Sequence, residues 1–467
     1  MVGIIGFAAG LPGYCVARDT IATAWETRSL GGHLSTRRFD EDSLTLAAAA
    51  GQDCLATLPA KTAGGLYFAT TTAPFLERLN AGLIAAILDL PRGVRTADFG
   101  NSLRAGLFAL GAGADAIDAG HSESILITAA DTRNAAPGSD EEQYFGDAAA
   151  AIALGRENVL AEIVARADIY DDFLETVRRD RDVYVTSFAS KFTTDRGYIK
   201  NMAAVIQEIL HEAKLEPAQI ARLVVSSPDK SAPQALAKKL GFQPAQIQDT
   251  GWDQIGTTGA VMPLLLLAAA LESAKPGEYI LLAGHGDGAG AIVLHATDAV
   301  AKYAPRVSFA AQSSARIEFP SYARWRKSRD YLRVQDETLE ISNIFYAKEE
   351  AQDVRLRGVE CGHCGTRQLQ HQQLCPKCRK GDALEEVSLA RTGCVFTYSV
   401  DHLFPAPFPP TTMAVVDLDG GGRIYSEVVD CEAGRVQIGM PVELTIRRFK
   451  EGGGLHHYYW KCRPKRF

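Results

Sequence analysis

The sequence predicts an α/β protein with a layered, internally duplicated body, followed by a four-cysteine ribbon and a small β-barrel. Three observations lead to this fold class. A nine-residue motif occurs twice, four cysteines form two C-x-x-C pairs, and the last part of the chain alternates short β-type runs with turns. With 467 residues, 46% of them hydrophobic and 22% charged, the chain can form two or three globular domains.

The duplication rests on the motif GDAAAAIAL at 146–154, which returns as GDGAGAIVL at 286–294. In each half it follows a small-residue turn, an Ala-rich helix and an apolar strand, namely 100–102, 105–119 and 125–130 in the first half and 256–258, 259–274 and 279–284 in the second. Two copies of the same unit predict a sheet in each half. Helices that are apolar on every side are buried, so we expect both between two sheets. Their N-termini would then offer unpaired N–H groups to an oxyanion or a phosphate near the centre of the molecule.

The composition changes after about residue 300. A basic, aromatic stretch at 319–331 is typical of a helical connector, and five short β-type runs near the end predict a barrel of the OB type. These runs are 394–400, 412–418, 423–429, 442–446 and 456–462. The expected division of the chain is 1–155 and 156–300 for the two halves of the body, 301–355 for the connector, 356–390 for the ribbon and 391–467 for the barrel.

The cysteine pairs predict a metal site. Cys361 and Cys364 form one C-x-x-C turn, and Cys375 and Cys378 form the other. Two such turns supply the four thiolates that tetrahedral Zn²⁺ prefers, and four thiolates leave no open position for a substrate, so the zinc would be structural. A disulfide framework is the alternative, although secreted disulfide scaffolds spread their cysteines while these cluster.

Charge and hydropathy limit the partners. The net charge is −7, but the part after residue 300 carries about five more basic than acidic side chains. That surplus could meet nucleic acid, an anionic cofactor or an acidic partner, or it could be a solvated face. We do not expect a nucleic-acid partner, since the body would then have no role.

The longest apolar run, 261–271, is shorter than the roughly 20 residues that span a bilayer, and the start has no basic leader region. A cytoplasmic protein without membrane segments is expected.

Several motifs resemble a known family. They are 40–43 (DEDS), 144–151 (YFGDAAAA), 195–200 (DRGYIK), 237–242 (AKKLGF) and 284–290 (GHGDGAG). Residues 1 to about 298 resemble the hydroxymethylglutaryl-CoA synthase branch of the thiolase superfamily, and the rest resembles the zinc-ribbon and OB-fold accessory domain that pairs with thiolase-like proteins. The resemblance implies a thiolase-like layered αβαβα body, an acyl-CoA substrate with coenzyme A as part of it, and a homodimer or a thiolase-like partner.

The family's catalytic side chains are replaced in this chain. In the family a Cys opens the first buried helix and forms an acyl-enzyme, and Leu103 stands at that position. Ser226 stands at the position of the family's His, Thr257 at that of its Asn, and Thr71 at that of its general-base Glu. Leucine cannot attack a thioester, and Ser102 beside it has no evident base. Cys15 and Cys54 lie far from any helix-opening turn and are expected in the core.

The chemistry that survives without a covalent step is aldol or retro-aldol cleavage next to a CoA thioester, which needs an enolate stabiliser and one acid/base group. His285 is the imidazole in a segment that the family places at its active centre, although it could instead only hydrogen-bond the loop. The candidate catalytic residues are His285, Ser102, Ser226, Thr257 and Asp229, and the candidate CoA-binding residues are Arg104, Lys200, Gly286 and Gly288.

Two other functions stay open. One is condensation or acyl transfer without a cysteine intermediate. The other is a non-catalytic thiolase-like subunit that shares its CoA site with a catalytic homologue.

Overall fold

The protein is described by a computed structural model that covers residues 1–59, 61–188, 190–329, 342–369, 372–403, 406–452 and 455–466. It consists of two compact units. The first unit comprises Met1–Arg38, Asp42–Ile84 and Gly93–Trp325, and the second comprises Phe39–Glu41, Ala85–Arg92 and Arg326–Phe467. Residues 330–341 of the predicted connector lie outside the described residues. The finer division of the chain into five parts stays a prediction.

Within the described residues, the first unit contains a nine-stranded sheet in the order β11-β12-β13-β8-β1-β7-β6-β4-β5. Its strands are β1 (Gly3–Gly10), β4 (Gly65–Ala69), β5 (Arg95–Phe99), β6 (Ile125–Asp131), β7 (Ala148–Gly155), β8 (Ala161–Tyr170), β11 (Ile220–Val225), β12 (Tyr279–His285) and β13 (Gly288–Ala296). Strand β1 pairs with both β7 and β8 and thereby joins the two halves. The strands expected at 125–130 and 279–284 are confirmed, and each repeated motif forms the turn and strand that follow.

The two Ala-rich helices form the middle of this unit. Helix α4 (Ala105–Asp118) and helix α9 (Met262–Leu271), which follows the 3₁₀ turn η5 (Gly259–Val261), share one hydrophobic core with β1, β6, β7, β12 and β13. Because they are apolar on nearly every side, they are buried between the two halves of the sheet, as expected. Their N-terminal turns approach closely: a Cβ added to Gly106 would lie 2.7 Å from the carbonyl oxygen of Ala260.

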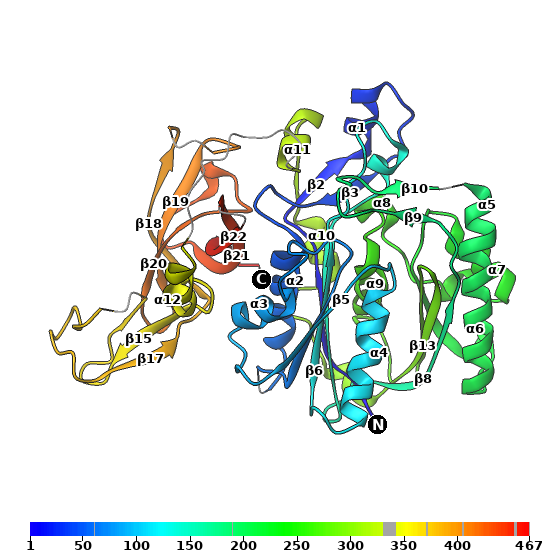
Figure 1. Ribbon diagram of the computed structural model, residues 1–467, viewed down its shortest axis with the longest axis horizontal. Helices are drawn as coiled ribbons and strands as arrows, with labels where there is room; N and C mark the ends of the chain where they lie inside the picture. Colours follow the sequence, from blue (N-terminus) through cyan, green and yellow to red (C-terminus); the bar gives the residue numbers. More distant parts are fainter. Residues whose placement is uncertain are drawn as a thin grey trace. The chain divides into compact units, whose positions relative to one another are not determined.

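Outer helices complete five layers (Figure 1). Helix α2 (Ser43–Leu55) packs on β1, β6 and β7, and helices α6 (Lys200–Ala213) and α7 (Ala232–Leu240) cover the half that contains β8, β12 and β13. Alternate residues of a strand face opposite sides. Accordingly Ile280 and Leu282 of β12 belong to the central core, whereas Leu281 and Ala283 belong to the core beneath α6. The predicted layered αβαβα body is confirmed.

Smaller elements surround these layers. A three-stranded sheet has the order β14-β2-β3, a two-stranded one pairs β10 with β9, and a π-helical turn η2 leads into α6. The remaining bounds are α1 (Arg18–Trp25), β2 (Tyr14–Ala17), β3 (His33–Thr36), α3 (Asn80–Ile87), β9 (Thr176–Val177), β10 (Thr186–Ser187), α5 (Lys191–Thr193), η2 (Thr194–Ile199), α8 (Trp252–Ile255), α10 (Phe309–Ser314), β14 (Ile317–Glu318) and α11 (Tyr322–Ser328).

The second unit contains helix α12 (Asn343–Asp353), a ribbon and a barrel. The ribbon is the sheet β16-β15-β17, and the barrel is the sheet β20-β19-β18-β21-β22. Two hydrogen bonds nearly close the barrel, from Ser426 Oγ to Trp460 O (2.9 Å) and from Val429 N to Cys462 O (2.8 Å). All five predicted strands are present. The bounds are β15 (Arg357–Cys361), β16 (Arg367–Gln368), β17 (Leu384–Ser388), β18 (Thr392–Asp401), β19 (Thr411–Leu418), β20 (Arg423–Glu427), β21 (Pro441–Gly452) and β22 (Leu455–Pro464).

A buried cluster of ion pairs, the barrel ion cluster, occupies the β21–β22 side of this unit. Arg447 contacts Glu41 (2.7 Å) and Asp430 (2.5 Å), and its side chain is 1% exposed. Lys461 contacts Asp40 (2.8 Å). The early residues Phe39–Glu41 therefore belong structurally to the C-terminal unit, which the sequence did not indicate.

Among the described residues, no helix is long and apolar enough to cross a membrane.

Candidate functional site

The N-terminal turn of α4 is closed by the Gly284–Gly290 loop. The Ser102 hydroxyl donates to Gly286 O (3.3 Å) and accepts from Arg104 N (3.3 Å). Gly286 lies directly against Leu103, because a Cβ added to it would lie 2.9 Å from Leu103 Cβ. In the family that this chain resembles, position 103 carries a nucleophile. Here it carries a half-buried leucine, and the backbone of Gly286 packs against it.

Arg104 braces this loop. Its side chain is 4% exposed, and the guanidinium donates to Gly286 O (2.6 Å) and to Asp287 O (3.0 Å). It also contacts Asp168 (3.3 Å). Burial lowers the pKa of Arg104, and the nearby Asp168 and Asp287 oppose that shift. With its donors directed at loop carbonyls, Arg104 has a structural role, and contact with coenzyme A stays a prediction.

His285 lies at the end of β12, on the side of the sheet that faces α6. Its side chain is 7% exposed, and Nδ1 lies 2.9 Å from Oε2 of Glu175, whose side chain is 16% exposed. The structure records no hydrogen bond from Nε2 to any described residue. The backbone N–H of His285 donates to Ser226 Oγ (3.0 Å). Two of the predicted residues, His285 and Ser226, are therefore neighbours.

The π-helical turn η2 borders the imidazole. The ring of Tyr198 meets that of His285 nearly at right angles, with centroids 5.5 Å apart, and its hydroxyl donates to Ser226 O (2.8 Å). Burial raises the pKa of Tyr198, so the phenol stays protonated. A Cβ added to Gly197 would lie 2.9 Å from the ring of Phe173 and 3.7 Å from His285 Cε1. Single π turns inside helices occur frequently at functional sites.

Asp131 organises the turn at the start of α9. Its Oδ1 accepts from Thr70 Oγ1 (2.9 Å), Thr71 N (2.7 Å) and Thr72 Oγ1 (3.0 Å). Its Oδ2 accepts from Thr71 Oγ1 (2.9 Å) and Ala260 N (2.7 Å). The backbone N–H of Ala260, at the start of this helix, is therefore already bonded to Asp131. The sequence had led us to expect such an N–H group to bind a ligand. Arg133 lies nearby: burial lowers its pKa, and Asp131 and Glu175 oppose that shift.

Thr257 is engaged in a turn-to-turn contact. Its N–H and hydroxyl donate to Tyr144 O (2.7 and 3.2 Å), and its carbonyl accepts from Gly146 N (2.9 Å). The neighbouring Thr258 is fully buried, and its hydroxyl has no hydrogen-bond partner among the residues that the structure describes. Thr258 is thus the side chain of this turn with unused hydrogen-bonding capacity.

The other predicted residues lie farther out. Asp229 caps the start of α7 by accepting from Ser231 N (2.7 Å) and Ala232 N (2.9 Å). Lys200 pairs with Asp171 (3.1 Å) and is 61% exposed. Gly288 has a φ of +109° and lies against the β8 backbone, where a Cβ would be 2.2 Å from Ile169 O.

Two cysteines outside the ribbon were expected in the core, and the structure agrees with this expectation. Cys15 and Cys54 are both buried in the first unit. Burial raises the pKa of the Cys54 thiol to about 12, so this thiol is protonated near neutral pH and is not a nucleophile.

Three residues near the site escaped the sequence analysis: Glu175, Asp131 and Arg133. Glu175 precedes the short strand β9 in a segment without apolar periodicity, so no pattern marked it. Asp131 is the last residue of the apolar strand β6. A single acidic residue at the end of an apolar strand was the only feature of the sequence that could have marked it as a site residue.

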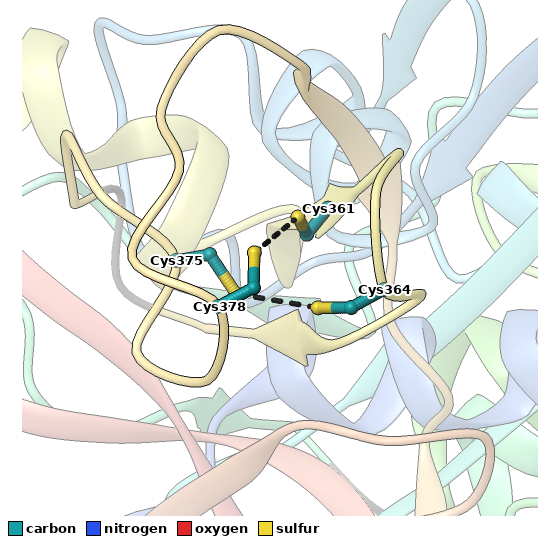
Figure 2. Close-up of side chains that lie close together, drawn as sticks. All are labelled: Cys361, Cys364, Cys375 and Cys378. Atoms are coloured by element: carbon teal, nitrogen blue, oxygen red, sulfur yellow. Dashed lines mark hydrogen bonds between the residues drawn. The ribbon is translucent and has the colours of Figure 1, made fainter.

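The four ribbon cysteines converge on one point (Figure 2). Their Sγ atoms all lie within 4.8 Å of one another, with Cys361–Cys378 and Cys364–Cys375 at 3.6 Å. Two thiolates bound to one tetrahedral zinc at about 2.3 Å would be about 3.8 Å apart. The geometry fits a single metal ion, and the four cysteines are free of disulfides.

Comparisons with known proteins agree with this architecture. Residues 386–447 match the family described as ChsH2, C-terminal OB-fold domain, and residues 210–295 match the C-terminal domain of 3-oxoacyl-[acyl-carrier-protein] synthase III. The hydroxymethylglutaryl-CoA synthase of Methanopyrus kandleri is 27% identical over 341 residues, which are 70% of this chain and 97% of that protein.

The C-terminal part has a relative of its own. A DUF35 domain-containing scaffold protein of Methanocaldococcus jannaschii is 42% identical over 114 residues, which are 23% of this chain and 81% of that protein. Among solved structures, MvaS in complex with 3-hydroxy-3-methylglutaryl coenzyme A has a TM-score of 0.63 at 16% identity and covers 73% of this chain and 97% of that one. The C-terminal part of the chain therefore belongs to the DUF35 family as an OB-fold domain, and it follows a body of thiolase-like fold that is similar in sequence to hydroxymethylglutaryl-CoA synthases.

Proposed function

We propose that this protein is an acyl-CoA enzyme that makes or breaks a carbon–carbon bond next to a CoA thioester by aldol or retro-aldol chemistry. One observation carries the proposal: the position of the family's nucleophile is Leu103, packed against Gly286, and the residue before that glycine is His285, a buried imidazole paired with a carboxylate at the end of β12. A covalent acyl-enzyme cannot form on a leucine. Acid/base chemistry on a β-hydroxyacyl-CoA needs no such intermediate.

In the cleavage direction, Nε2 of His285 takes the proton of the β-hydroxyl group. The bond between the α and β carbons then breaks, the β carbon becomes the carbonyl of an aldehyde or ketone, and the electron pair forms the enolate of a shorter CoA ester. The imidazolium returns its proton to the α carbon. No electrons are lost or gained overall, and synthesis is the reverse sequence. The enolate oxygen needs a hydrogen-bond donor other than Ala260 N–H, which is bonded to Asp131.

The test is a panel of β-hydroxyacyl-CoA esters, analysed for a free aldehyde or ketone and a shortened CoA ester. We expect cleavage, and we expect His285→Ala to lower kcat by about 10²–10⁴-fold, the usual contribution of a general acid/base. His211→Ala, an exposed histidine of α6, is the matched control and should retain full activity. Cleavage that continues unchanged in His285→Ala would remove this residue from the mechanism.

The DUF35 relative favours a second candidate, because its name describes it as a scaffold protein. In this alternative the chain is a non-catalytic thiolase-like subunit that shares a CoA site with a partner. Absence of turnover on every CoA ester, together with stable co-purification with an active thiolase, would support it. A third candidate, acyl transfer or condensation without a cysteine intermediate, would instead yield a lengthened product from two acyl donors.

We further propose Zn²⁺ as the ion of the four-cysteine site, where it would hold the ribbon turns together and take no part in bond chemistry. Coenzyme A is proposed as part of the substrate, with Lys200 as the exposed candidate contact beside the loop glycines. The homodimer implied by the family resemblance is compatible with β5, the partly exposed edge strand of the sheet. Free cysteines throughout the chain are compatible with a reducing cytoplasm.

A further inference from the structure

The imidazole of His285 has a carboxylate partner from a part of the chain that belongs to neither repeated unit. Glu175 lies in the segment from Asp171 to Phe188, called here the crossing segment, which leaves the end of β8 and returns to α6. Nδ1 of His285 and Oε2 of Glu175 are 2.9 Å apart, and both side chains are largely buried. A carboxylate this close stabilises a proton on Nδ1 and thereby leaves Nε2 as the nitrogen that can accept a further proton.

Backbone bonds hold the crossing segment in place. Asp171 N donates to Asp287 O (3.2 Å), Phe188 N to Glu175 O (2.8 Å) and Val185 N to Asn134 O (2.9 Å). Near its middle, Arg178 donates to Thr71 O (2.7 Å). The segment is thus bonded to the loop after His285, to the residues that follow β6, and to the Thr70–Thr72 turn, called here the threonine turn. Glu175 is therefore fixed by the fold.

The other charged groups around the imidazole have partners of their own. Asp171 accepts from Lys200 (3.1 Å) and Asn201 (2.9 Å). Asp229 accepts from the start of α7, and Tyr198 is a protonated phenol bonded to Ser226. Arg133 is a buried cation whose charge interacts with that of Glu175. Glu175 is the carboxylate recorded in contact with the ring among the described residues.

We propose that Glu175 is the positioning residue of the acid/base His285: it orients the ring and keeps Nδ1 protonated so that Nε2 faces the substrate as a base. This inference rests on the proposed function, because it presumes that His285 transfers the substrate proton. It adds a role for a residue that lies outside both repeats. It also gives the crossing segment a function, since this segment supplies the carboxylate that positions His285.

The first measurement uses the unmodified full-length chain. Histidine labelled with ¹⁵N, assigned by comparison with His285→Gln, reports the tautomer of the neutral ring. We expect the form protonated at Nδ1, the opposite of the tautomer that free imidazole side chains favour in water. The Nε2-protonated form in the unmodified protein would overturn the proposal without any variant having to fold.

The second measurement compares variants. Glu175→Ala should shift the ring toward the Nε2-protonated tautomer and lower kcat on the order of 10- to 100-fold, the loss seen when a metal-bound histidine is deprived of its carboxylate partner, with KM nearly unchanged. Glu175→Asp, which keeps the charge, should recover part of kcat. Asp182→Asn, a partly exposed carboxylate of the same segment that pairs with Arg179 and does not contact the imidazole, is the control and should retain the unmodified tautomer and kcat.

The two proposals fail separately. If no CoA ester is cleaved but the tautomer is as expected and shifts in Glu175→Ala, the proposed reaction falls while the pairing stands. If cleavage requires His285 but neither tautomer nor kcat responds to Glu175→Ala, the role assigned to Glu175 is wrong.

Discussion

At the scale of single residues, Asp131 is the side chain on which the threonine turn depends. A fully buried carboxylate is costly unless it is hydrogen-bonded, and this one accepts from the Thr70–Thr72 turn and from the start of α9. It therefore joins a loop of the first half to the central helix of the second half. The position of Thr71 is a consequence of this carboxylate, because both its N–H and its hydroxyl donate to Asp131.

Asp131→Asn should destabilise the first unit. An amide has one acceptor oxygen in place of two, and its NH₂ group would face donors, so at least one buried N–H would lose its partner. A buried donor without a partner costs about 1–3 kcal/mol, and we expect the free energy of unfolding to fall by about 3 kcal/mol. Urea unfolding followed by hydrogen exchange in β4, β6 and α9 measures it. Asp182→Asn, on a partly exposed side chain that pairs with Arg179, should change the curve far less; an equally small change at Asp131 would contradict the assigned role.

At the scale of elements, the β21–β22 hairpin carries the barrel ion cluster in its interior. Replacing a whole buried ion pair by apolar groups is often neutral, but removing one partner leaves an uncompensated buried charge. The barrel also contains an exposed pair of the same types, Arg423 with Asp417 at 2.5 Å. These two pairs separate the effect of burial from that of the contact itself.

Arg447→Met should destabilise the barrel by about 3–5 kcal/mol, since Glu41 and Asp430 would remain buried without this cation. Arg423→Met should have no measurable effect, because water and salt already screen that pair. Denaturant dependence of hydrogen exchange in β18 to β22 measures both variants on the same strands. If both variants lost the same free energy of unfolding, burial of the ion pair would not determine the cost of removing its cation.

At the scale of the whole molecule, the chain consists of two units with different sources of stability. The first has a large apolar core of two helices between two half-sheets, whereas the ribbon is a three-stranded sheet around four thiolates. A sheet this small buries too little apolar surface to be stable without a crosslink or a metal.

Metal removal should therefore act on one unit only. We expect about one zinc per chain, and we expect chelation to abolish hydrogen-exchange protection in β15 and β17 while β1 and β7 keep theirs. Cys375→Ser should reproduce the chelated state without a chelator. Loss of protection in β1 and β7 on chelation would mean that the metal also stabilises the thiolase-like body.

The sequence predicted the elements better than the contacts. The repeated motif and the two apolar helices gave the layered body because their periodicity reports burial directly. The period of two in β12 already implied that His285 faces the same side as Leu281 and Ala283, away from the central helices. Glu175 could not be found in this way, since a long-range contact made by an irregular segment leaves no periodic trace. The same holds for Phe39–Glu41, whose place beside the barrel depends on tertiary structure alone.

The contact between Gly286 and Leu103 also bears on which side chains position 103 can carry. A side chain at 286 would collide with Cβ, Cα and N of residue 103, atoms that every residue except glycine possesses. The leucine branches beyond Cβ are not among these nearest atoms. A thiol could therefore be placed at position 103 by one substitution without moving the loop. The close approach of the loop to α4 is thus set by backbone and Cβ atoms, and Leu103→Cys should leave the Gly284–Gly290 loop in place.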